Sequence, residues 1–172
     1  MGQADFCPMG GNIMMQAVIM AGGKGTRLAA LTKDEIPKPM VPVAGKPLLL
    51  WQVERLKENE ITDIIMVIGH LGDKIKEYFG DGEKFGVSIR YFEETEPLGT
   101  AGSFYYLKDM IHGDRFVMMS GDLFFDIDFQ RMIRFHEEKG AVATLFVHPN
   151  GHPFDSDLLV LDKDDKIPAF DS

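Results

Sequence analysis

A glycine-rich segment, residues 21–28 (AGGKGTRL), directly follows a short apolar run near the start of the chain. Gly22, Gly23 and Gly25 let the backbone turn tightly and approach a ligand, and their N–H groups can point inward to bind phosphate oxygens. Arg27 adds a planar guanidinium with paired N–H donors, which suits phosphate. The pattern predicts a phosphate-binding loop, with an ordinary strand-to-loop turn as the alternative.

Two better-known phosphate loops do not fit this segment. A Walker loop needs four residues between its first glycine and a Gly-Lys pair, followed by Ser or Thr, and this spacing is absent. The dinucleotide-binding fingerprint needs a third glycine where Leu28 stands. A phosphate-binding loop at this place would therefore be of another kind.

Lys38 stands between two prolines in the segment 36–40 (IPKPM). Proline fixes its own backbone and restricts the residue before it, so we expect Lys38 in an extended segment and no helix there. A lysine held in this way loses little backbone entropy when it binds an anion. A solvated lysine in a proline-rich loop is the alternative.

A second glycine-containing segment, residues 94–102 (ETEPLGTAG), lies between a predicted strand and a predicted helix. Gly99 and Gly102 permit the close approach of a ligand. Thr100, or the N-terminus of the helix, can hold polar or anionic groups. A turn followed by a helix cap is the alternative interpretation of this segment.

Asp122 follows Ser120 and Gly121 directly after another apolar run. A carboxylate at the end of a buried strand is well placed to bind Mg²⁺, a cation that takes oxygen ligands. An aspartate of a loop or of a helix cap is the alternative. Asp126 and Asp128 are weaker metal candidates, because a helix cap and intervening apolar residues account for that stretch.

Short apolar runs bounded by turn residues predict the buried strands that position these motifs. The predicted strands, of which the last two are more weakly marked, are 17–20, 64–68, 116–119, 141–147, 87–92 and 158–161. Helical patterns lie between them. One helix begins at Pro47, one spans 73–79, and Thr100 and Asp128 each cap another.

Strands that alternate with helices predict a three-layer α/β/α domain with a mainly parallel, mixed sheet. In such sheets, ligands bind beyond the carboxyl ends of the strands, and the motifs with chemical potential follow strands here. We expect residues 15–172 to form this single domain. Residues 1–14 show no periodicity and are expected to be a loose leader or tag.

The chain of 172 residues carries 18 Lys and Arg against 27 Asp and Glu, a net charge of −9. It therefore lacks the basic surface expected of a protein that binds nucleic acid or a membrane surface. No uncharged apolar run approaches the roughly 18 residues of a membrane span, and the one cysteine, Cys7, cannot form an internal disulfide. We expect a cytoplasmic protein that binds anionic ligands with a local cluster of cations and backbone amides.

Taken together and in order, the motifs resemble those of the sugar-1-phosphate nucleotidyltransferase family. They occupy residues 22–28, 37–39, 96–102 and 121–122, and the resemblance runs from about residue 15 to at least residue 143. The motif EPLGTAG is similar to that of the guanylyltransferase branch, which includes mannose-1-phosphate and D-glycero-D-manno-heptose-1-phosphate guanylyltransferases. The segments YFGDG and HPFDSD make the heptose type the nearest.

The resemblance implies a Rossmann-like nucleotide-diphospho-sugar transferase fold. It also implies an enzyme that transfers a nucleoside monophosphate, GMP by preference, to a manno-heptose or mannose type of sugar 1-phosphate and releases pyrophosphate. The catalytic residues so implied are Arg27, Lys38 and Asp122, with Mg²⁺ held by Asp122. The residues implied in nucleotide binding are Ala21, Gly22, Gly23, Gly25, Thr26, Arg27, Glu94, Pro97, Gly99 and Thr100.

Glu94 corresponds best to the position that contacts the base in this family, and Glu96 comes second. A carboxylate can accept hydrogen bonds from both N1–H and N2–H₂ of guanine, which favours GTP over UTP or TTP, although backbone groups could do the same. His70 follows the predicted strand at 64–68 and is a candidate for contact with the base or ribose. An ordinary loop histidine is the alternative.

The family's domain continues further than this sequence, and its downstream lysine and second metal-binding aspartate find no match here. We therefore expect the domain to be truncated at its C-terminus, with the nucleotide half whole and the fragment alone slow or inactive. The alternative functions are a uridylyl-, thymidylyl- or adenylyltransferase and a non-catalytic domain that binds a nucleotide-sugar and regulates a partner. Whether the chain forms a homo-oligomer is left open.

Overall fold

The computed structural model describes residues 15–23, 35–95, 99–149 and 158–171. The chain divides into two compact units, residues 1–129 and 130–172, each of which is described by itself. The predicted leader, residues 1–14, lies outside the described residues. No helix in the described ranges is long and apolar enough to cross a lipid bilayer.

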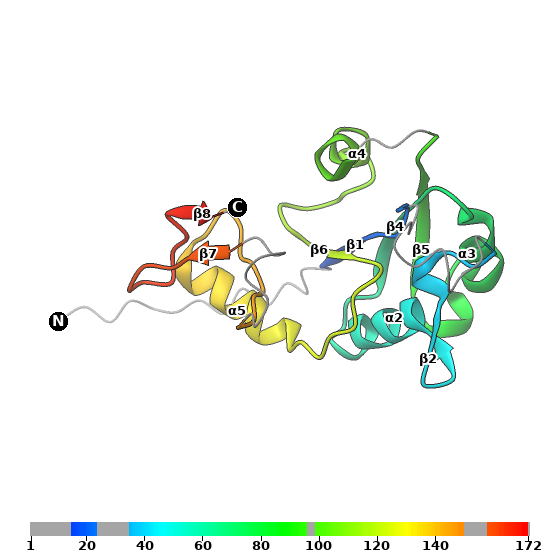
Figure 1. The fold of residues 1–172 in the computed structure, drawn as a ribbon, viewed down its shortest axis with the longest axis horizontal. Coiled ribbons are helices and arrows are strands. Elements are labelled where there is room, and N and C mark those ends of the chain that lie inside the picture. Colours follow the sequence, from blue (N-terminus) through cyan, green and yellow to red (C-terminus); the bar gives the residue numbers. More distant parts are fainter. Residues whose placement is uncertain (1–14, 24–34, 96–98, 150–157, 172) are drawn as a thin grey trace. The chain divides into compact units, whose positions relative to one another are not determined.

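A four-stranded parallel sheet forms the centre of the first unit (Figure 1). Its strands are β1 (Gln16–Met20), β4 (Asp63–Ile68), β5 (Ser88–Glu93) and β6 (Phe116–Ser120), in the order β5-β4-β1-β6. The register pairs Met20 with Val67 on one side and with Ser120 on the other, and it pairs Ile68 with Glu93. The four strands therefore end close to one level, and the predicted parallel sheet is confirmed.

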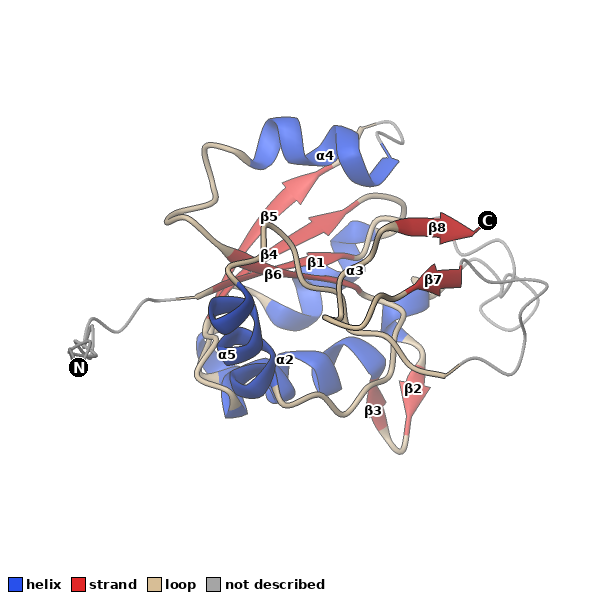
Figure 2. Ribbon diagram, turned by 90° about the vertical axis from the view of Figure 1, so that its left-hand side faces the viewer, coloured by secondary structure: helices blue, strands red, loops and turns tan. Residues whose placement is uncertain are grey.

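Helices cover both faces of this sheet (Figure 2). On one face, α2 (Leu48–Glu58) and α3 (Gly72–Phe79) pack in a cluster with Ile19, Ile64 and Met66. On the other face, Leu107 of α4 (Gly99–Leu107) packs against a second cluster of strand residues. Strands covered on both faces read as continuous apolar runs, which explains why their sequence pattern predicted them.

Two predicted helix starts are displaced by one or two residues. Pro47 is the residue before α2, where its backbone is extended, and the helix begins at Leu48. Thr100 was expected to cap α4, but the helix begins at Gly99, so Thr100 lies inside it. The helix after Asp128 begins, as predicted, at Phe129. The element α3 confirms the helix predicted at 73–79.

The amino ends of the strands are tied together by a small polar network. The Gln16 Nε2 atom donates to Asp63 Oδ2 at 2.7 Å, and the Arg90 guanidinium pairs with Asp63 Oδ1 at 3.1 Å. Gln16 is 1% exposed, so its amide needs such partners. This network joins the amino ends of β1, β4 and β5, which lie opposite the carboxyl ends of the strands.

The short elements of the first unit connect the main ones. They are the 3₁₀ helix η2 (Lys38–Met40), the paired strands β2 (Pro42–Val43) and β3 (Lys46–Pro47), and the 3₁₀ helix η3 (Glu83–Phe85). The β2–β3 hairpin leads directly into α2. The Trp51 Nε1 atom donates to the carbonyl of Val43 at 2.9 Å and so fixes the hairpin against that helix.

The second unit contains most of α5 (Phe129–Lys139) and an antiparallel pair, β7 (Leu158–Val160) and β8 (Ala169–Asp171). The Lys139 Nζ atom pairs with Asp165 Oδ2 at 3.1 Å. The strand predicted at 141–147 is wrong: that stretch is irregular, and Val142 is fully exposed. An apolar run becomes a strand only beside another strand that accepts its hydrogen bonds, and none in the described ranges pairs with it.

Candidate functional site

The carboxyl ends of the parallel strands bring four separate loops to one edge of the sheet. Hydrogen bonds between neighbouring strands continue into these loops: Ala21 N–H donates to the Val67 carbonyl at 2.7 Å, and Gly121 N–H donates to the Met20 carbonyl at 2.8 Å. Glu94 N–H donates to the Ile68 carbonyl at 2.8 Å. The first residues after β1, β6 and β5 are thus held by hydrogen bonds that continue the pairing of the strands.

Two of these loops touch backbone to backbone, and glycine is required where they meet. A Cβ atom added to Gly69 would lie 2.9 Å from the carbonyl oxygen of Gly22. A Cβ atom added to Gly22 would lie 3.0 Å from Glu94 Oε2. The glycines therefore allow the loops after β1 and β4 to come together beside the Glu94 carboxylate.

Lys38 and Asp122 form an ion pair, although they are 84 residues apart in the sequence. The Lys38 Nζ atom donates to Asp122 Oδ2, while the Ser120 hydroxyl donates to Asp122 Oδ1 at 2.6 Å. Both charged side chains keep about 30% of their surface exposed, 30% and 31%. The pair is held in place from both sides and is still open to a ligand.

The extended conformation expected for Lys38 is wrong. Lys38 is the first residue of η2, with the Met40 N–H donating to the Pro37 carbonyl at 2.7 Å. Proline is compatible with the first turn of a helix, because the N–H that it lacks has no partner in that turn. The two prolines still fix the backbone, and both are buried, so Lys38 projects from a rigid turn.

The pKa of Asp122 reflects these contacts. Burial on its own raises the pKa, but the hydrogen bonds from Lys38 and Ser120 and the positive charge of Lys38 outweigh it. The net result is a pKa below the ordinary value of an aspartate. Asp122 is therefore an anion at neutral pH.

Glu94 directly follows β5, and its carboxylate is held by the Ser103 hydroxyl, which donates to Glu94 Oε1. Ser103 lies on α4 and is completely buried. Adjacent parallel strands lie about 4.8 Å apart, so three strand spacings put Glu94 about 14 Å from the loop of Asp122. The edge of the sheet can thus contact a base at one end and phosphates at the other.

Asp122 offers a single carboxylate as a ligand for Mg²⁺. Within the part of the chain that the structure describes, no three His, Cys, Asp or Glu side chains gather into a metal site. Mg²⁺ is commonly held by one or two carboxylates together with the phosphates of a substrate, so one carboxylate near a phosphate site is sufficient. Asp126, a weaker candidate, instead pairs with Arg55 Nη2 at 2.8 Å.

The predicted site residues divide into two groups. Those that the structure brings to this edge of the sheet are Ala21, Gly22, Gly23, Lys38, Glu94 and Asp122, with the backbone of Gly99 and Thr100 at the start of α4. Those that lie outside the described residues are Gly25, Thr26, Arg27 and Pro97. His70 is exposed in the loop after β4.

Three further residues of the site were not predicted from the sequence: Ser103, Ser120 and Gly69. A serine gives no local signal of which carboxylate its hydroxyl will bind, whether two residues away, as for Ser120, or nine, as for Ser103. Gly69 directly follows a buried strand and precedes the candidate His70, so its position after the strand was the signal that could have identified it.

A sequence model of the family described as "Nucleotidyl transferase" matches residues 16–171. The chain is 36% identical over 161 residues to a probable mannose-1-phosphate guanylyltransferase 1 of Oryza sativa subsp. japonica, covering 91% of this chain and 44% of the relative. It is 42% identical over 129 residues to the D-glycero-alpha-D-manno-heptose 1-phosphate guanylyltransferase of Campylobacter jejuni, covering 75% and 57%.

Relatives of other base specificity match as well. The chain is 35% identical over 169 residues to the UTP–glucose-1-phosphate uridylyltransferase of Synechocystis, covering 91% of this chain and 43% of the relative. Across these three curated relatives, the chain therefore spans between 43% and 57% of their own length.

Two solved structures share the fold. One is a putative glucose-1-phosphate thymidylyltransferase from Bacillus anthracis, with a TM-score of 0.81 and 29% identity, covering 91% of this chain and 63% of that chain. The other is HddC from Yersinia pseudotuberculosis complexed with GMP-PN, with a TM-score of 0.71 and 26% identity, covering 91% and 68%. The Rossmann-like nucleotidyltransferase fold expected from the sequence is confirmed.

The contact between Gly69 and Gly22 predicts a stability difference between two glycine substitutions. Gly69→Ala forces two backbone segments apart and should lower the free energy of unfolding by about 1–3 kcal/mol. Gly23→Ala, where an added Cβ meets nothing within 4 Å, should change it by less than about 0.5 kcal/mol. Urea denaturation measures both, and equal losses would contradict the close approach.

The lowered pKa of Asp122 predicts an acid-labile contribution to stability. A carboxyl group whose pKa is lower in the folded than in the unfolded state stabilises the fold above its unfolded pKa, near 3.9, and this is lost as the pH falls through the folded value. Because the pair is partly exposed, we expect at most about 1 kcal/mol.

Thermal unfolding of the parent protein and of Asp122→Asn across pH measures this contribution. The parent should unfold at a higher temperature at pH 7, and the difference should shrink as the pH falls below about 3.9 and through the folded pKa of Asp122, where its carboxyl group becomes neutral. A difference that stays constant between pH 7 and pH 3 would show that the charge of Asp122 does not cause it.

Proposed function

The chain belongs to the nucleotidyl transferase family, and from this premise we propose that it forms the nucleotide-binding part of an enzyme acting on sugar 1-phosphates. The enzyme joins a nucleoside triphosphate to the sugar 1-phosphate and releases pyrophosphate. One observation carries the proposal: the carboxyl edge of the sheet holds the Lys38–Asp122 pair at one end and the Glu94 carboxylate at the other. Such an edge is where parallel α/β sheets bind ligands.

The reaction is an in-line displacement at the α-phosphorus. An oxygen of the sugar phosphate forms the new P–O bond, and the bond to the pyrophosphate group breaks and leaves its electron pair on pyrophosphate. The attacking oxygen is already an anion, so the enzyme needs no strong general base. Its task is to bring two polyanions together and to stabilise the charge on the phosphoryl oxygens.

Lys38 and Asp122 divide this task between them. In the absence of substrate each satisfies the charge of the other. When a triphosphate binds, the ammonium group of Lys38 turns to the phosphate oxygens, and the Asp122 carboxylate is left free to hold Mg²⁺. Mg²⁺ held there would supply further positive charge to the phosphates. The backbone N–H groups of Gly22 and Gly23, together with Arg27, bind the triphosphate.

Guanine is the base that Glu94 fits best. Its N1–H and N2–H₂ groups are adjacent donors, and a carboxylate accepts from both, whereas uracil and thymine offer a single N–H on that edge. The buried Ser103 hydroxyl occupies Oε1 of Glu94 and orients the group. The guanylyltransferase relatives and the GMP-PN complex of HddC support this choice.

A uridylyl- or thymidylyltransferase is the second candidate. It is favoured by the match to the Synechocystis uridylyltransferase at 35% identity and by the thymidylyltransferase structure with a TM-score of 0.81. A ranking of the four triphosphates by thermal shift separates the candidates, because tighter binding raises the apparent stability more. A larger shift with UTP or TTP than with GTP would reverse the base assignment.

Because Lys38 and Asp122 have separate roles in this mechanism, we expect the loss of either side chain to lower turnover. In the full-length protein, Lys38→Ala and Asp122→Ala should each lower pyrophosphate release from GTP, Mg²⁺ and mannose 1-phosphate or a manno-heptose 1-phosphate by roughly 10²–10³-fold. The matched control is Lys84→Ala, which removes an exposed lysine of η3 near the amino end of β5. No turnover with any triphosphate would overturn the proposed function.

We expect the substitution Glu94→Gln to change the preference between bases. The variant loses the negative charge and one acceptor, so the ratio of GTP to UTP affinity should fall by about tenfold, as expected for one charged hydrogen bond. Calorimetric titration with each nucleotide measures the ratio. Glu93→Gln is the neighbouring control, since Glu93 pairs with the exposed Lys76. If the affinities for GTP and UTP fall equally, Glu94 does not take part in base recognition.

A further inference from the structure

Gln52 is a buried amide on α2 whose polar group reaches the segment that carries Asp122. The side chain is 2% exposed. Its Nε2 atom donates two hydrogen bonds, to the Ser120 carbonyl at 3.0 Å and to the Leu123 carbonyl at 2.6 Å. These two carbonyls flank Asp122 on either side, so a single amide group spans the turn from which the carboxylate projects.

Packing alone does not account for an amide at this position. The Oε1 atom of Gln52 is buried and finds no hydrogen-bond partner in the described part of the chain. A buried acceptor without a partner costs free energy that an apolar side chain of similar size would avoid. What the amide adds is the pair of donors on Nε2, and two carbonyl acceptors determine which end of the amide faces them.

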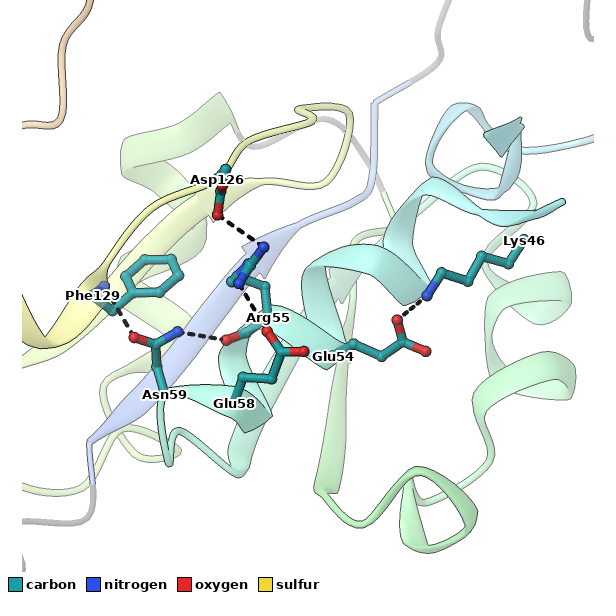
Figure 3. Close-up of polar contacts among 7 residues, drawn as sticks. All are labelled: Lys46, Glu54, Arg55, Glu58, Asn59, Asp126 and Phe129. Carbon is teal, nitrogen blue, oxygen red and sulfur yellow. Dashed lines mark hydrogen bonds and ion pairs between the residues drawn. The ribbon is translucent and has the colours of Figure 1, made fainter. Parts of the chain in front are cut away.

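Beyond Gln52, two more residues on the same side of α2 contact the segment that follows β6 (Figure 3). The Arg55 guanidinium pairs with Asp126 Oδ1 at 2.8 Å, and Asn59 Oδ1 accepts from the Phe129 N–H at 3.2 Å. Residues at i, i+3 and i+7 share one side of a helix. The helix thus contacts this segment at three points, of which the Gln52 contact is the one nearest Asp122.

The three contacts differ in strength. Asp126 is 84% exposed, and an ion pair in that setting contributes little. The Phe129 contact lies at the far end of the segment, where α5 begins. The hydrogen bonds of Gln52 are buried and charge-neutral, and they replace bonds that the two carbonyls would otherwise make to water.

We infer that Gln52 is a positioning residue: the two hydrogen bonds of its amide fix the turn at 120–123 so that Asp122 faces Lys38. Gln52 acts through the backbone on either side of Asp122, since its amide donates to the Ser120 and Leu123 carbonyls. The role in metal-dependent nucleotide binding rests on the proposed function, whereas the role in fixing the turn does not.

Hydrogen–deuterium exchange tests the fixing of the turn without reference to function. Gln52→Met keeps the volume and removes both donors. Exchange at the amides of residues 121–123 should become about five- to tenfold faster, with β4 unchanged. Glu54→Gln is the matched control on the same helix, since it removes only the pair with Lys46 and should leave these amides unaffected. Unchanged protection, or a uniform increase that includes β4, would overturn the inference.

A measurement on the parent protein covers the case in which Gln52→Met does not fold. The side-chain amide protons of Gln52 should exchange far more slowly than those of a glutamine in a short unstructured peptide, because both are engaged with carbonyls. Exchange as fast as in that peptide would overturn the inference by itself.

Nucleotide affinity with and without metal separates positioning from general damage. In Gln52→Met, the gain in GTP affinity that Mg²⁺ confers over EDTA should fall by about five- to tenfold, while the affinity in EDTA changes less than twofold. A merely structural role would weaken both alike and would overturn the role in metal binding. If the parent protein binds no nucleotide, the proposed function fails, and the exchange experiment still decides the role of Gln52 in the turn.

Discussion

The in-phase ending of four parallel strands is the constraint on which the rest of the structure depends. β1 lies in the middle of the sheet, pairs with β4 and β6, and carries three residues, Ala17, Val18 and Ile19, that are completely buried. The connections from β1 to β4 and from β5 to β6 use helices on opposite faces of the sheet, and the segment after β6 packs through Phe125 and Phe129 in the same cluster as α2. Sheets of this kind bind ligands beyond the carboxyl ends of their strands, where Gly22 and Asp122 lie.

The positive charge that the site needs is supplied locally, although the chain as a whole is negative. The protein carries a net charge of −9, yet the proposed substrates are polyanions. The Lys38–Asp122 pair resolves this, because it keeps a cation at the phosphate end without leaving it unpaired before the substrate arrives. The carboxylate that would otherwise repel the phosphates serves in the proposed mechanism to hold Mg²⁺. Backbone N–H groups add attraction without adding net charge.

The sheet was largely predictable from the sequence and the polar contacts of the site were not. Strands such as β4 are buried on both faces, so an apolar run marks them directly. The same signal failed at 141–147, because a strand also requires a partner that a local pattern cannot reveal. The sequence identifies Lys38 as a candidate site residue but does not indicate its helical turn, because proline usually ends a helix and yet also suits the first turn of one. Ser103 and Gln52 gave no signal, because what matters about each is a partner brought near by the fold.

The most direct test of the account is a map of amide chemical-shift changes when GTP and Mg²⁺ are added to the labelled protein. We expect the largest changes at the carboxyl edge of the sheet, at Gly22, Gly23, Lys38, Glu94 and Asp122. The opposite edge, closed by the network of Gln16, Asp63 and Arg90, should stay unchanged. Changes centred on that opposite edge, or none at saturating nucleotide, would contradict it.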